Sequence, residues 1–358
     1  MADVLVVNAG STSLKLHLVD EAGDAAAVAG LEAVDPGRVE AVAHRIVHGG
    51  PRFRDPVVID DAVREQIHRL EPLAPLHNAP ALRALADARK RVPRAPHVAV
   101  FDTGFHATIP AAAATYAVPG RWRDEWGVRR YGFHGISVAW AAERVPELLG
   151  RPAADLRLVV CHLGGGSSVT AVAGGRSVDT TMGFSPLEGV PMATRSGSVD
   201  PGALVYVLRR SGMGADELEI ALNEQSGLAA LAGDDGGMVE LEHAAAGGDG
   251  RAALAIDVYV HHVAAAAAAM AAAAGGMDAL VFTAGIGEGS ATVRARVCAR
   301  LAFLGVALDE DRNEAAAPDC DLAAAGSQVA VAVIHAREEL VAARAARVAL
   351  SQELHGRL

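Results

Sequence analysis

The sequence predicts an α/β protein made of two duplicated domains, and three observations carry this prediction. Residues 4–19 consist of an apolar strand, one polar residue, a turn of glycine and hydroxyl residues, and a second strand. Residues 158–172 repeat this plan about 150 positions later, which is the sign of an internal duplication. At 358 residues the chain is also long enough to bury two substantial cores.

The two repeats share a turn suited to anions. Asn8 and His162 fall at equivalent places, as do Gly10 and Gly164. Glycines followed by hydroxyl residues expose backbone N–H groups with no side chain in the way, and this suits an oxygen of a phosphate group. We therefore expect one phosphate-binding hairpin in each half.

A single arginine stands in the loop segment that follows the second repeat. Arg195 lies among Gly, Ser, Thr and Pro residues that are unsuited to a helix interior. An arginine so placed is a candidate for holding a phosphoryl group or a carboxylate with two parallel hydrogen bonds. Taken by itself, the segment is also compatible with a solvated loop that carries a surface arginine.

Composition limits the classes of function. The net charge of −11 and the lack of a basic run argue against nucleic-acid binding. Met1 leads directly into a strand, so no secretory signal is expected, and the longest apolar run, residues 263–274, is too short to span a bilayer. Three scattered cysteines predict neither a disulfide framework nor a zinc site, and we expect a cytoplasmic protein without a membrane partner.

The first half is expected to alternate strands and helices. The predicted elements are a loop at 21–38, a strand at 39–47, helices at 62–70 and 79–91 separated by the turn LAPLHNAP, and a strand at 97–101. Asp102 directly follows this last strand. Open α/β sheets place their chemistry at the carboxyl ends of strands, so Asp102 is a candidate site residue.

The second half is expected to continue the alternation. The predictions are a connection between the domains at 109–123, helices at 138–149, 203–210, 215–222 and 251–274, strands at 279–283 and 329–334, a helix beginning at Ser290, and a last helix at 338–354. The alanine-dense helix 251–274 suits close packing, either in a dimer interface or inside the domain. The strand, glycine turn and helix start around Gly285, Gly287 and Glu288 are typical of an anion or nucleotide site.

Motifs spread over nearly the whole chain resemble those of the acetate kinase family, in the acetate and sugar kinase/actin superfamily. They are VLVVNAGSTSLK, AHRIVHGG, LAPLHN, FDTGFH, YGFHG, CHLGGGSS, TMGFSPLEGVPMATRSGSVDP, FTAGIGE and REEL. The resemblance implies two ribonuclease-H-like (actin-like ATPase) domains around a central cleft. One comprises residues 1–108 with the last helix (340–358) returning to it, and the other comprises residues 109–339 with the nucleotide site and the interface of a homodimer.

The resemblance also implies a reaction, the reversible transfer of a phosphoryl group between ATP and acetate to give ADP and acetyl phosphate by direct in-line transfer. Acetate is already ionised at neutral pH, so no general base is needed. In the family pattern Arg45 and Arg195 hold the carboxylate and the moving phosphoryl group. His134 donates a hydrogen bond to the phosphoryl oxygens, and His77 supports substrate binding.

The remaining family positions concern the metal, the nucleotide and the acyl group. Asn8 and Glu338 are expected to position Mg²⁺ (Mn²⁺ is an alternative) through waters, with Asp102 close to the metal and the path of the phosphoryl group. Residues expected to face the phosphates or the nucleotide are Ser11, Ser13, Lys15, His162, Gly164, Gly165, Gly166, Gly285, Gly287 and Glu288. The small apolar acyl pocket is expected to consist of Val47, Leu76, Phe133 and Pro186, so that propionate is a weaker substrate than acetate.

Departures from the family pattern lie on the nucleotide side. Three glycines, 164–166, replace Gly-Asn-Gly, and by register Gly237 and Val239 stand where the family has an aspartate and an arginine around adenosine. Two phosphoryl donors therefore remain possible. One is ATP, held by looser contacts, and the other is a different donor such as pyrophosphate. Butyrate specificity is disfavoured by Val47 and Pro186. A non-catalytic actin-like sensor is a reading from a different class, and it has no need for the full set of polar residues.

Overall fold

The computed structural model describes residues 3–10, 14–233 and 236–356, and within these residues the chain forms two six-stranded sheets. The first sheet has the strand order β3-β2-β1-β4-β6-β5. Its strands are β1 (Asp3–Ala9), β2 (Leu14–Val19), β3 (Ala25–Val28), β4 (Val39–Ile46), β5 (Val57–Val58) and β6 (His97–Phe101). The β1–β4 and β4–β6 pairs are parallel, and the other pairs are antiparallel.

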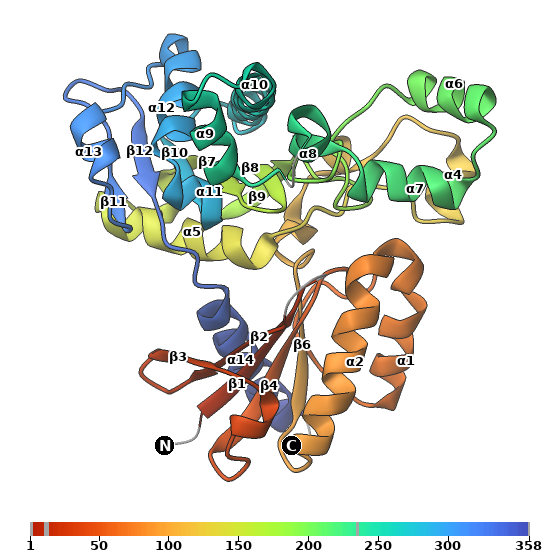
Figure 1. Cartoon of the computed structure of the whole chain (residues 1–358). Helices are drawn as coiled ribbons and strands as arrows, with labels where there is room; N and C mark the ends of the chain where they lie inside the picture. Colours follow the sequence, from red (N-terminus) through yellow and green to blue (C-terminus); the bar gives the residue numbers. More distant parts are fainter. Residues whose placement is uncertain (1–2, 11–13, 234–235, 357–358) are drawn as a thin grey trace.

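The second sheet repeats this topology. Its order is β9-β8-β7-β10-β12-β11, with the parallel pairs again in the centre, between β7 and β10 and between β10 and β12. Its strands are β7 (Arg157–Leu163), β8 (Ser167–Ala173), β9 (Arg176–Thr180), β10 (Ala279–Thr283), β11 (Cys320–Asp321) and β12 (Ala330–Val333). The predicted duplication is therefore confirmed, and Figure 1 shows the two units one above the other.

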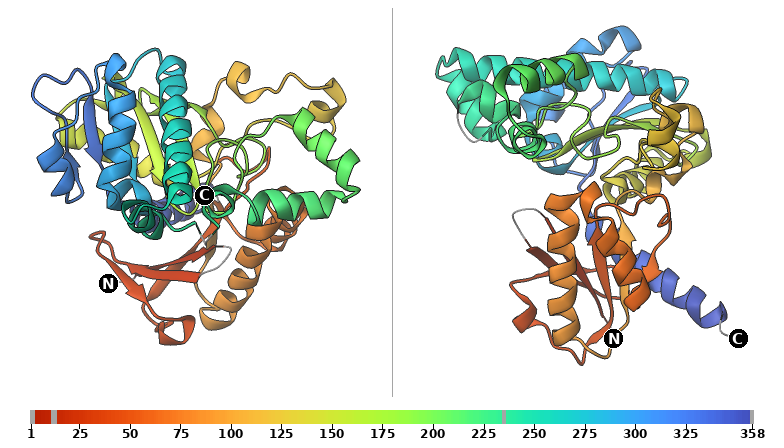
Figure 2. Two further views of the ribbon diagram at one scale, coloured as in Figure 1. Left: turned by 45° about the horizontal axis from the view of Figure 1, so that its top comes forward. Right: turned by 90° about the vertical axis from the view of Figure 1, so that its right-hand side faces the viewer.

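Helices cover both faces of the first sheet. Alternate residues of β1 face opposite sides: Leu5 and Val7 pack with α2 (Pro75–Arg91), and Val4 and Val6 pack with the last helix, α14 (Glu338–Gly356). A strand buried on both faces must be apolar throughout, which explains the unbroken run at the start of the chain. Figure 2 shows α14 leaving the second unit and lying along the first.

The second sheet is covered in the same way by α5 (Gly135–Leu149) and α10 (Gly250–Ala273). By length and composition α10 could cross a membrane. In the fold it packs against β7 and β8, with ten of its residues buried. One face of α10 therefore has the packing role considered for residues 251–274, and the role in a dimer interface stays a prediction.

The remaining helices lie at the edges of the two units. They are α1 (Asp61–Arg69), α3 (Ala111–Ala114), α4 (Gly120–Asp124), α6 (Pro201–Ser211), α7 (Ala215–Glu224), α8 (Gly227–Ala232), α9 (Met238–Ala246), α11 (Ala284–Gly289), α12 (Ala291–Arg300) and α13 (Glu310–Glu314), with short 3₁₀ turns at Leu31–Ala33, Glu71–Leu73, Phe105–Thr108, Ala153–Asp155 and Ala302–Leu304. Helices α6 and α7 extend away from the body of the second unit as an arm (Figures 1 and 2).

Four local predictions were wrong or incomplete. The expected loop 21–38 contains the edge strand β3, whose small alanines pair with β2 but give little periodicity. The expected turn LAPLHNAP mostly belongs to α2, which begins at Pro75 because proline fits the first position of a helix. The connection 109–123 contains α3 and α4. A short helix, α11, replaces the glycine turn, and Ser290 then caps α12 by accepting a hydrogen bond from the amide of Val293.

Candidate active site

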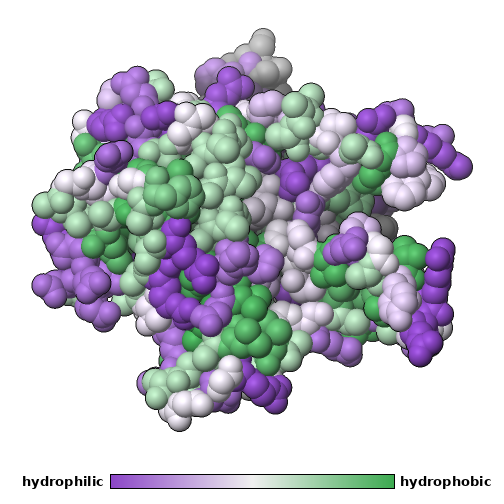
Figure 3. Space-filling view, turned by 90° about the horizontal axis from the view of Figure 1, so that it is seen from above, coloured by the Kyte–Doolittle hydropathy of each residue, from purple (hydrophilic) through white to green (hydrophobic). Residues whose placement is uncertain are grey.

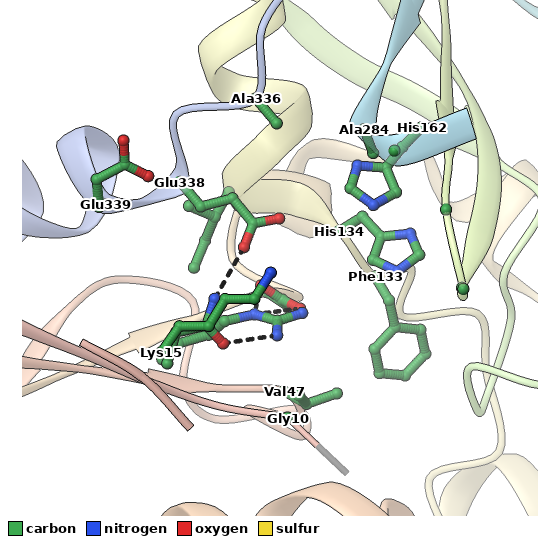
Figure 4. A pocket seen from close by; sticks show the side chains of 18 of the residues that line it. Gly10, Lys15, Val47, Phe133, His134, His162, Ala284, Ala336, Glu338 and Glu339 are labelled. Carbon is green, nitrogen blue, oxygen red and sulfur yellow. Dashed lines mark hydrogen bonds and ion pairs between the residues drawn. The ribbon is translucent and has the colours of Figure 1, made fainter. Parts of the chain in front are cut away.

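A cavity of about 710 Å³ lies between the two units and is lined by both. The predicted residues that line it are Asn8, Lys15, Arg45, Val47, Asp102, Phe133, His134, His162, Gly164, Gly165, Gly166, Pro186, Arg195, Gly285, Glu288 and Glu338. Figure 4 shows Val47 and Lys15 on the side of the first sheet and His134 and His162 opposite them. Residues that are far apart in the chain thus share one space.

Arg45 is the centre of a polar network on the side of the first sheet. It lies on β4, and its Nε donates to both carboxylate oxygens of Asp102, at 3.0 and 3.1 Å, with a further short contact from Nη2. Its Nη1 donates to Oδ1 of Asn8 at 3.0 Å. Asn8 in turn donates to Glu338 at 3.1 Å, so strands β1, β4 and β6 and helix α14 are joined at one point.

Charge in this network is set by burial and pairing. Burial lowers the pKa of Arg45, but the charges of Asp102 and Glu338 outweigh it, and the pKa of Arg45 ends well above its usual value. Burial raises the pKa of Asp102, and the guanidinium of Arg45 opposes this rise. Because arginine remains protonated in proteins, the carboxylate that accepts its two-pronged hydrogen bonds is ionised at neutral pH. Both of its oxygens accept hydrogen bonds from the guanidinium, so Asp102 orients Arg45.

His134 occupies a strained position before α5. Its φ of 58° lies in the left-handed region, which is uncommon for a residue other than glycine and typical of functional sites. The next residue, Gly135, donates its amide to the backbone oxygen of Asp102 at 2.9 Å. A Cβ at Gly135 would lie 2.1 Å from this oxygen, so only glycine permits the approach. The loop that carries His134 is thus fixed to the loop that carries Asp102.

Two histidines stack at the opposite wall of the cavity. The ring centroids of His134 and His162 are 4.0 Å apart, with the planes 23° from parallel (Figure 4). Burial, followed by the neighbouring ring and the charge of Arg45, lowers the pKa of His134 well below its usual value. Burial and Arg45 lower the pKa of His162 to about 4. Both rings are therefore neutral at physiological pH.

Arg195 approaches the same wall at the turn of the second hairpin. A Cβ built on Gly166 would lie 3.1 Å from Nε2 of His134 and 3.6 Å from Nη1 of Arg195. Two polar nitrogens of different chemistry, one from an imidazole and one from a guanidinium, therefore lie close to the same stretch of bare backbone. Arg195 is held from behind, because its Nη1 also donates to the backbone oxygen of Pro186 at 3.1 Å.

Glu288 lines the cavity, but its oxygens are engaged within the chain. They accept from the amides of Ala284 and Ala336, at 3.0 and 2.9 Å, and Oε2 lies 2.5 Å from Nδ1 of His335. Gly287 is buried behind it against the strands and does not line the cavity. Arg294, itself buried, donates to the backbone oxygens of residues 287 and 288 and keeps α11 in place.

A small apolar group lies beside the polar one. Val47 and Phe133, which line the cavity, form a buried cluster with Ala74, Met182 and Met192. The sulfur of Met192 lies 3.6 Å from Nη1 of Arg195. An apolar part of the cavity wall therefore lies near the arginine, which suits a ligand with a charged end and a short apolar end.

The oxygen donors near Asn8 fit a magnesium ion. An amide oxygen and the carboxylates of Glu338 and Asp102 are hard ligands, and Mg²⁺ in nucleotide sites takes one or two of these together with waters and phosphate oxygens. In the described residues there is no group of three or more His, Cys, Asp or Glu that could hold a metal ion alone. A metal here would therefore rely on the nucleotide and on water for its remaining ligands.

The structure does not describe four of the predicted site residues in full. Ser11 and Ser13 lie outside the described residues, and the side chains of Leu76 and His77 are likewise not described. His17, His335 and Glu339 also line the cavity. Sequence reasoning missed these three, and it also missed the two serines that contact the stacked histidines. These serines, Ser137 and Ser168, stand in the motifs YGFHGIS and CHLGGGSS, and the motifs were the signal that could have found them.

The fold consists of two duplicated α/β domains around a cleft, and arginines, neutral histidines and glycine turns line this cleft. These features define a phosphotransferase of the actin-like superfamily. Comparison with known proteins gives the family. The model of the acetokinase family matches residues 33–344, and the chain belongs to this family. It is 49% identical over 312 residues to the acetate kinase of Gloeobacter violaceus, covering 87% of this chain and 76% of that protein.

Other relatives match over their whole length. The chain is 42% identical to the acetate kinase of Leifsonia xyli, covering 98% of this chain and all of that protein. Among solved structures, a propionate kinase from Francisella tularensis has a TM-score of 0.91 at 32% identity, covering 97% of this chain and all of that one. The acetate kinase of Porphyromonas gingivalis has a TM-score of 0.87 at 32% identity, covering 98% and 100%.

Proposed function

We propose that the chain is an acetate kinase that catalyses the reversible transfer of a phosphoryl group between ATP and acetate, with acetyl phosphate and ADP as the other pair. Membership of the acetokinase family supports the reaction class. The site supports it independently, because phosphoryl transfer requires positioning and charge neutralisation more than covalent chemistry. Ionised groups and donors for both tasks line one cavity.

One observation carries the proposal furthest: Nε2 of His134 and Nη1 of Arg195 both lie within 3.6 Å of one point beside Gly166. A phosphoryl group in the cavity next to this bare backbone receives one neutral and one charged donor. Donors placed in advance where charge develops are among the largest contributions to catalysis. Acetate binds with its carboxylate toward Arg45 and its methyl group toward Val47 and Phe133.

Asn8 and Glu338 hold Mg²⁺, or Mn²⁺ in its place, mainly through water. When bound, the ion neutralises charge on the phosphate oxygens. Asp102 keeps the guanidinium of Arg45 oriented toward the carboxylate, and the glycine turns at 164–166 and at Gly285 offer backbone amides to the nucleotide phosphates. Lys15 faces the same phosphates from β2, and the proposal extends to Ser11, Ser13 and His77.

A second candidate function is the phosphorylation of propionate in place of acetate, and the structural likeness to a propionate kinase favours it. The buried Val47 at the wall of the apolar group disfavours it, because each added methylene must find room there. We therefore place acetate first and propionate as a weaker substrate.

A test is the formation of acetyl phosphate, trapped as the hydroxamate, from acetate and Mg²⁺ with ATP, GTP or pyrophosphate in parallel. Product with millimolar ATP supports the proposal, and product with pyrophosphate alone keeps the chemistry but replaces the donor. If protein with a native circular dichroism spectrum makes no product with any donor, the result favours a non-catalytic, actin-like sensor.

We propose that the chain forms a cytoplasmic homodimer through its second domain. In this proposal the first domain comprises residues 1–108 plus 340–358, and the second comprises residues 109–339. Helices α6 and α7 support this arrangement because they have no buried residues and expose large apolar side chains, among them Val205, Tyr206 and Ile220. In Figure 3 green patches lie at the right, on the side where this arm extends. Sedimentation of the wild type and of a Y206E/I220E variant tests it, since the variant is expected to be monomeric.

A further inference from the structure

Both stacked histidines bind a serine through the same ring nitrogen. Nδ1 of His134 lies 3.0 Å from Oγ of Ser168, and Nδ1 of His162 lies 2.8 Å from Oγ of Ser137. The serines are 0% and 1% exposed. Ser168 lies on β8 and Ser137 in the first turn of α5, so each hydroxyl is held by a regular element. With Nδ1 engaged, Nε2 is the nitrogen left to meet a ligand in the cavity.

The direction of these hydrogen bonds follows from the burial of the serines. A hydroxyl has one hydrogen, and a buried donor without an acceptor costs free energy. Within the described residues, the histidine nitrogen is the one hydrogen-bond partner that the structure gives to either hydroxyl. The hydroxyl hydrogen must therefore point at Nδ1, which accepts. A neutral imidazole that accepts at Nδ1 carries its proton on Nε2.

A third histidine, His106, also has a serine at its Nδ1, and here the direction of the hydrogen bond is fixed by a second partner. Nδ1 of His106 lies 2.8 Å from Oγ of Ser177, and its Nε2 lies 2.9 Å from the backbone oxygen of Phe133. A carbonyl can only accept, so Nε2 of His106 carries the proton and Ser177 donates to Nδ1. The two cavity histidines have the same serine contact, and both line the cavity.

We propose that Ser168 and Ser137 are positioning residues that hold His134 and His162 in the tautomer with the proton on Nε2, so that the stacked pair presents two N–H donors to the transferring phosphoryl group. This extends the donor role of His134 to His162 and assigns the serines a function. The catalytic part rests on the proposed function, whereas the tautomer is a property of the protein itself.

The first test reads the tautomer directly by NMR of protein labelled with ¹⁵N in its histidines. In an imidazole the protonated and unprotonated nitrogens have well-separated shifts, and the H134Q and H162Q variants assign the two rings. We expect protonated Nε2 and unprotonated Nδ1 for both at pH 7.5. A protonated Nδ1 on His134 overturns the proposal, whatever the activity of the enzyme.

The second test compares three serine variants. S168A is expected to lower kcat by about 10- to 100-fold, the usual cost of losing a residue that orients a reacting group, with little change in the KM for acetate. S168T keeps a hydroxyl and should recover most of the loss. S177A is the matched control, because the carbonyl of Phe133 still fixes His106, and its kcat should stay within about threefold of the wild type.

The outcomes separate the proposal from a merely structural role. If S168A loses no more kcat than S177A, or loses kcat while His134 keeps its proton on Nε2, the positioning role is wrong. If S168A does not fold, the wild-type spectrum still decides the tautomer. If the wild type makes no acetyl phosphate, the proposed function fails, and the NMR result stands separately.

Discussion

The imidazole rings of His134 and His162 stack with centroids 4.0 Å apart, although one belongs to the loop before α5 and the other to β7. A charge on either ring would face its neighbour and Arg45 in a buried site. The stack is therefore stable in its neutral form.

A first prediction concerns stability at acid pH. Burial lowers the pKa of His106 and of His162 from 6.5 to about 4. Between these values the unfolded chain binds more protons than the folded one, so stability is full above pH 6.5 and is lost as the pH falls toward 4. Each group contributes a slope of at most about 1.4 kcal/mol per pH unit.

Urea unfolding at pH 7.5, 6.0 and 5.0 measures this slope. The H106Q variant should be less stable at pH 7.5 and should show a shallower loss on acidification. A wild-type free energy of unfolding that stays constant from pH 7.5 to 5.0 would contradict the neutral state of these rings.

A second prediction concerns Gly166. Replacement by alanine puts a methyl group where Nε2 of His134 and Nη1 of Arg195 converge, so kcat should fall strongly while the fold is kept. Gly250 is the control, because a Cβ there meets nothing within 4 Å. G250A should match the wild type in steady-state assays, and an equally active G166A would show that the phosphoryl group lies elsewhere.

A third prediction concerns Arg195 itself. R195A should lower kcat by about 10²- to 10³-fold, the typical cost of removing one preorganised donor. Nucleotide binding, measured by calorimetry, should weaken much less, because the backbone turns remain. R176A, an exposed arginine on β9, serves as the control. A kcat for R195A within a few-fold of R176A would show that Arg195 does not hold the transferring phosphoryl group.

A fourth prediction concerns the pair formed by Asp102 and Arg45. D102N removes the carboxylate that pairs with the partly buried guanidinium of Arg45, and the free energy of unfolding should fall by about 3 kcal/mol, the lower end for breaking a buried pair because part of Arg45 is exposed and Glu338 remains nearby. The double variant R45M/D102N removes both charges and should regain part of this stability with no recovery of activity. Thermal unfolding and the acetate assay read the two effects separately, and a stable, active D102N would refute the orienting role.

A fifth prediction concerns the acyl pocket. V47A removes two methyl groups from the wall beside Phe133, and the ratio of kcat/KM for propionate to that for acetate should rise by about tenfold, the value of one methylene. V34A makes the same truncation in the core of the first domain and should lower stability with the ratio unchanged. An unchanged ratio in V47A would place the methyl group of acetate elsewhere.

Much of the fold was accessible from the sequence because its central strands are buried on both faces and read as apolar runs. Strand β9 was not predicted, since its inward residues are polar. Ser177 contacts His106, and Oγ1 of Thr180 lies 2.8 Å from Oγ1 of Thr170. Hydrogen-bonded side chains inside a domain leave no hydrophobic period to detect.

The site was predicted unevenly for a similar reason. Motif residues such as Arg45 and His134 line one cavity, and their roles there stay predictions. Glu288 was expected to face phosphate, yet it accepts from the amide of Ala336, 48 positions away in the chain. Partners that are brought together only by the folded backbone, including Ser168 with His134, cannot be read from local spacing.

The last helix has a consequence for the order of synthesis. Alanines of α14, including Ala343 and Ala346, close the face of the first sheet that is formed by Val4 and Val6, and Glu338 at its start binds Asn8. During translation the strands of the first sheet are made well before α14, because Asn8 and Glu338 are 330 positions apart, and one side of this sheet stays open to water until α14 has been made. The first domain is thus closed only after the second domain has been synthesised, and the cavity cannot form before α14 is present.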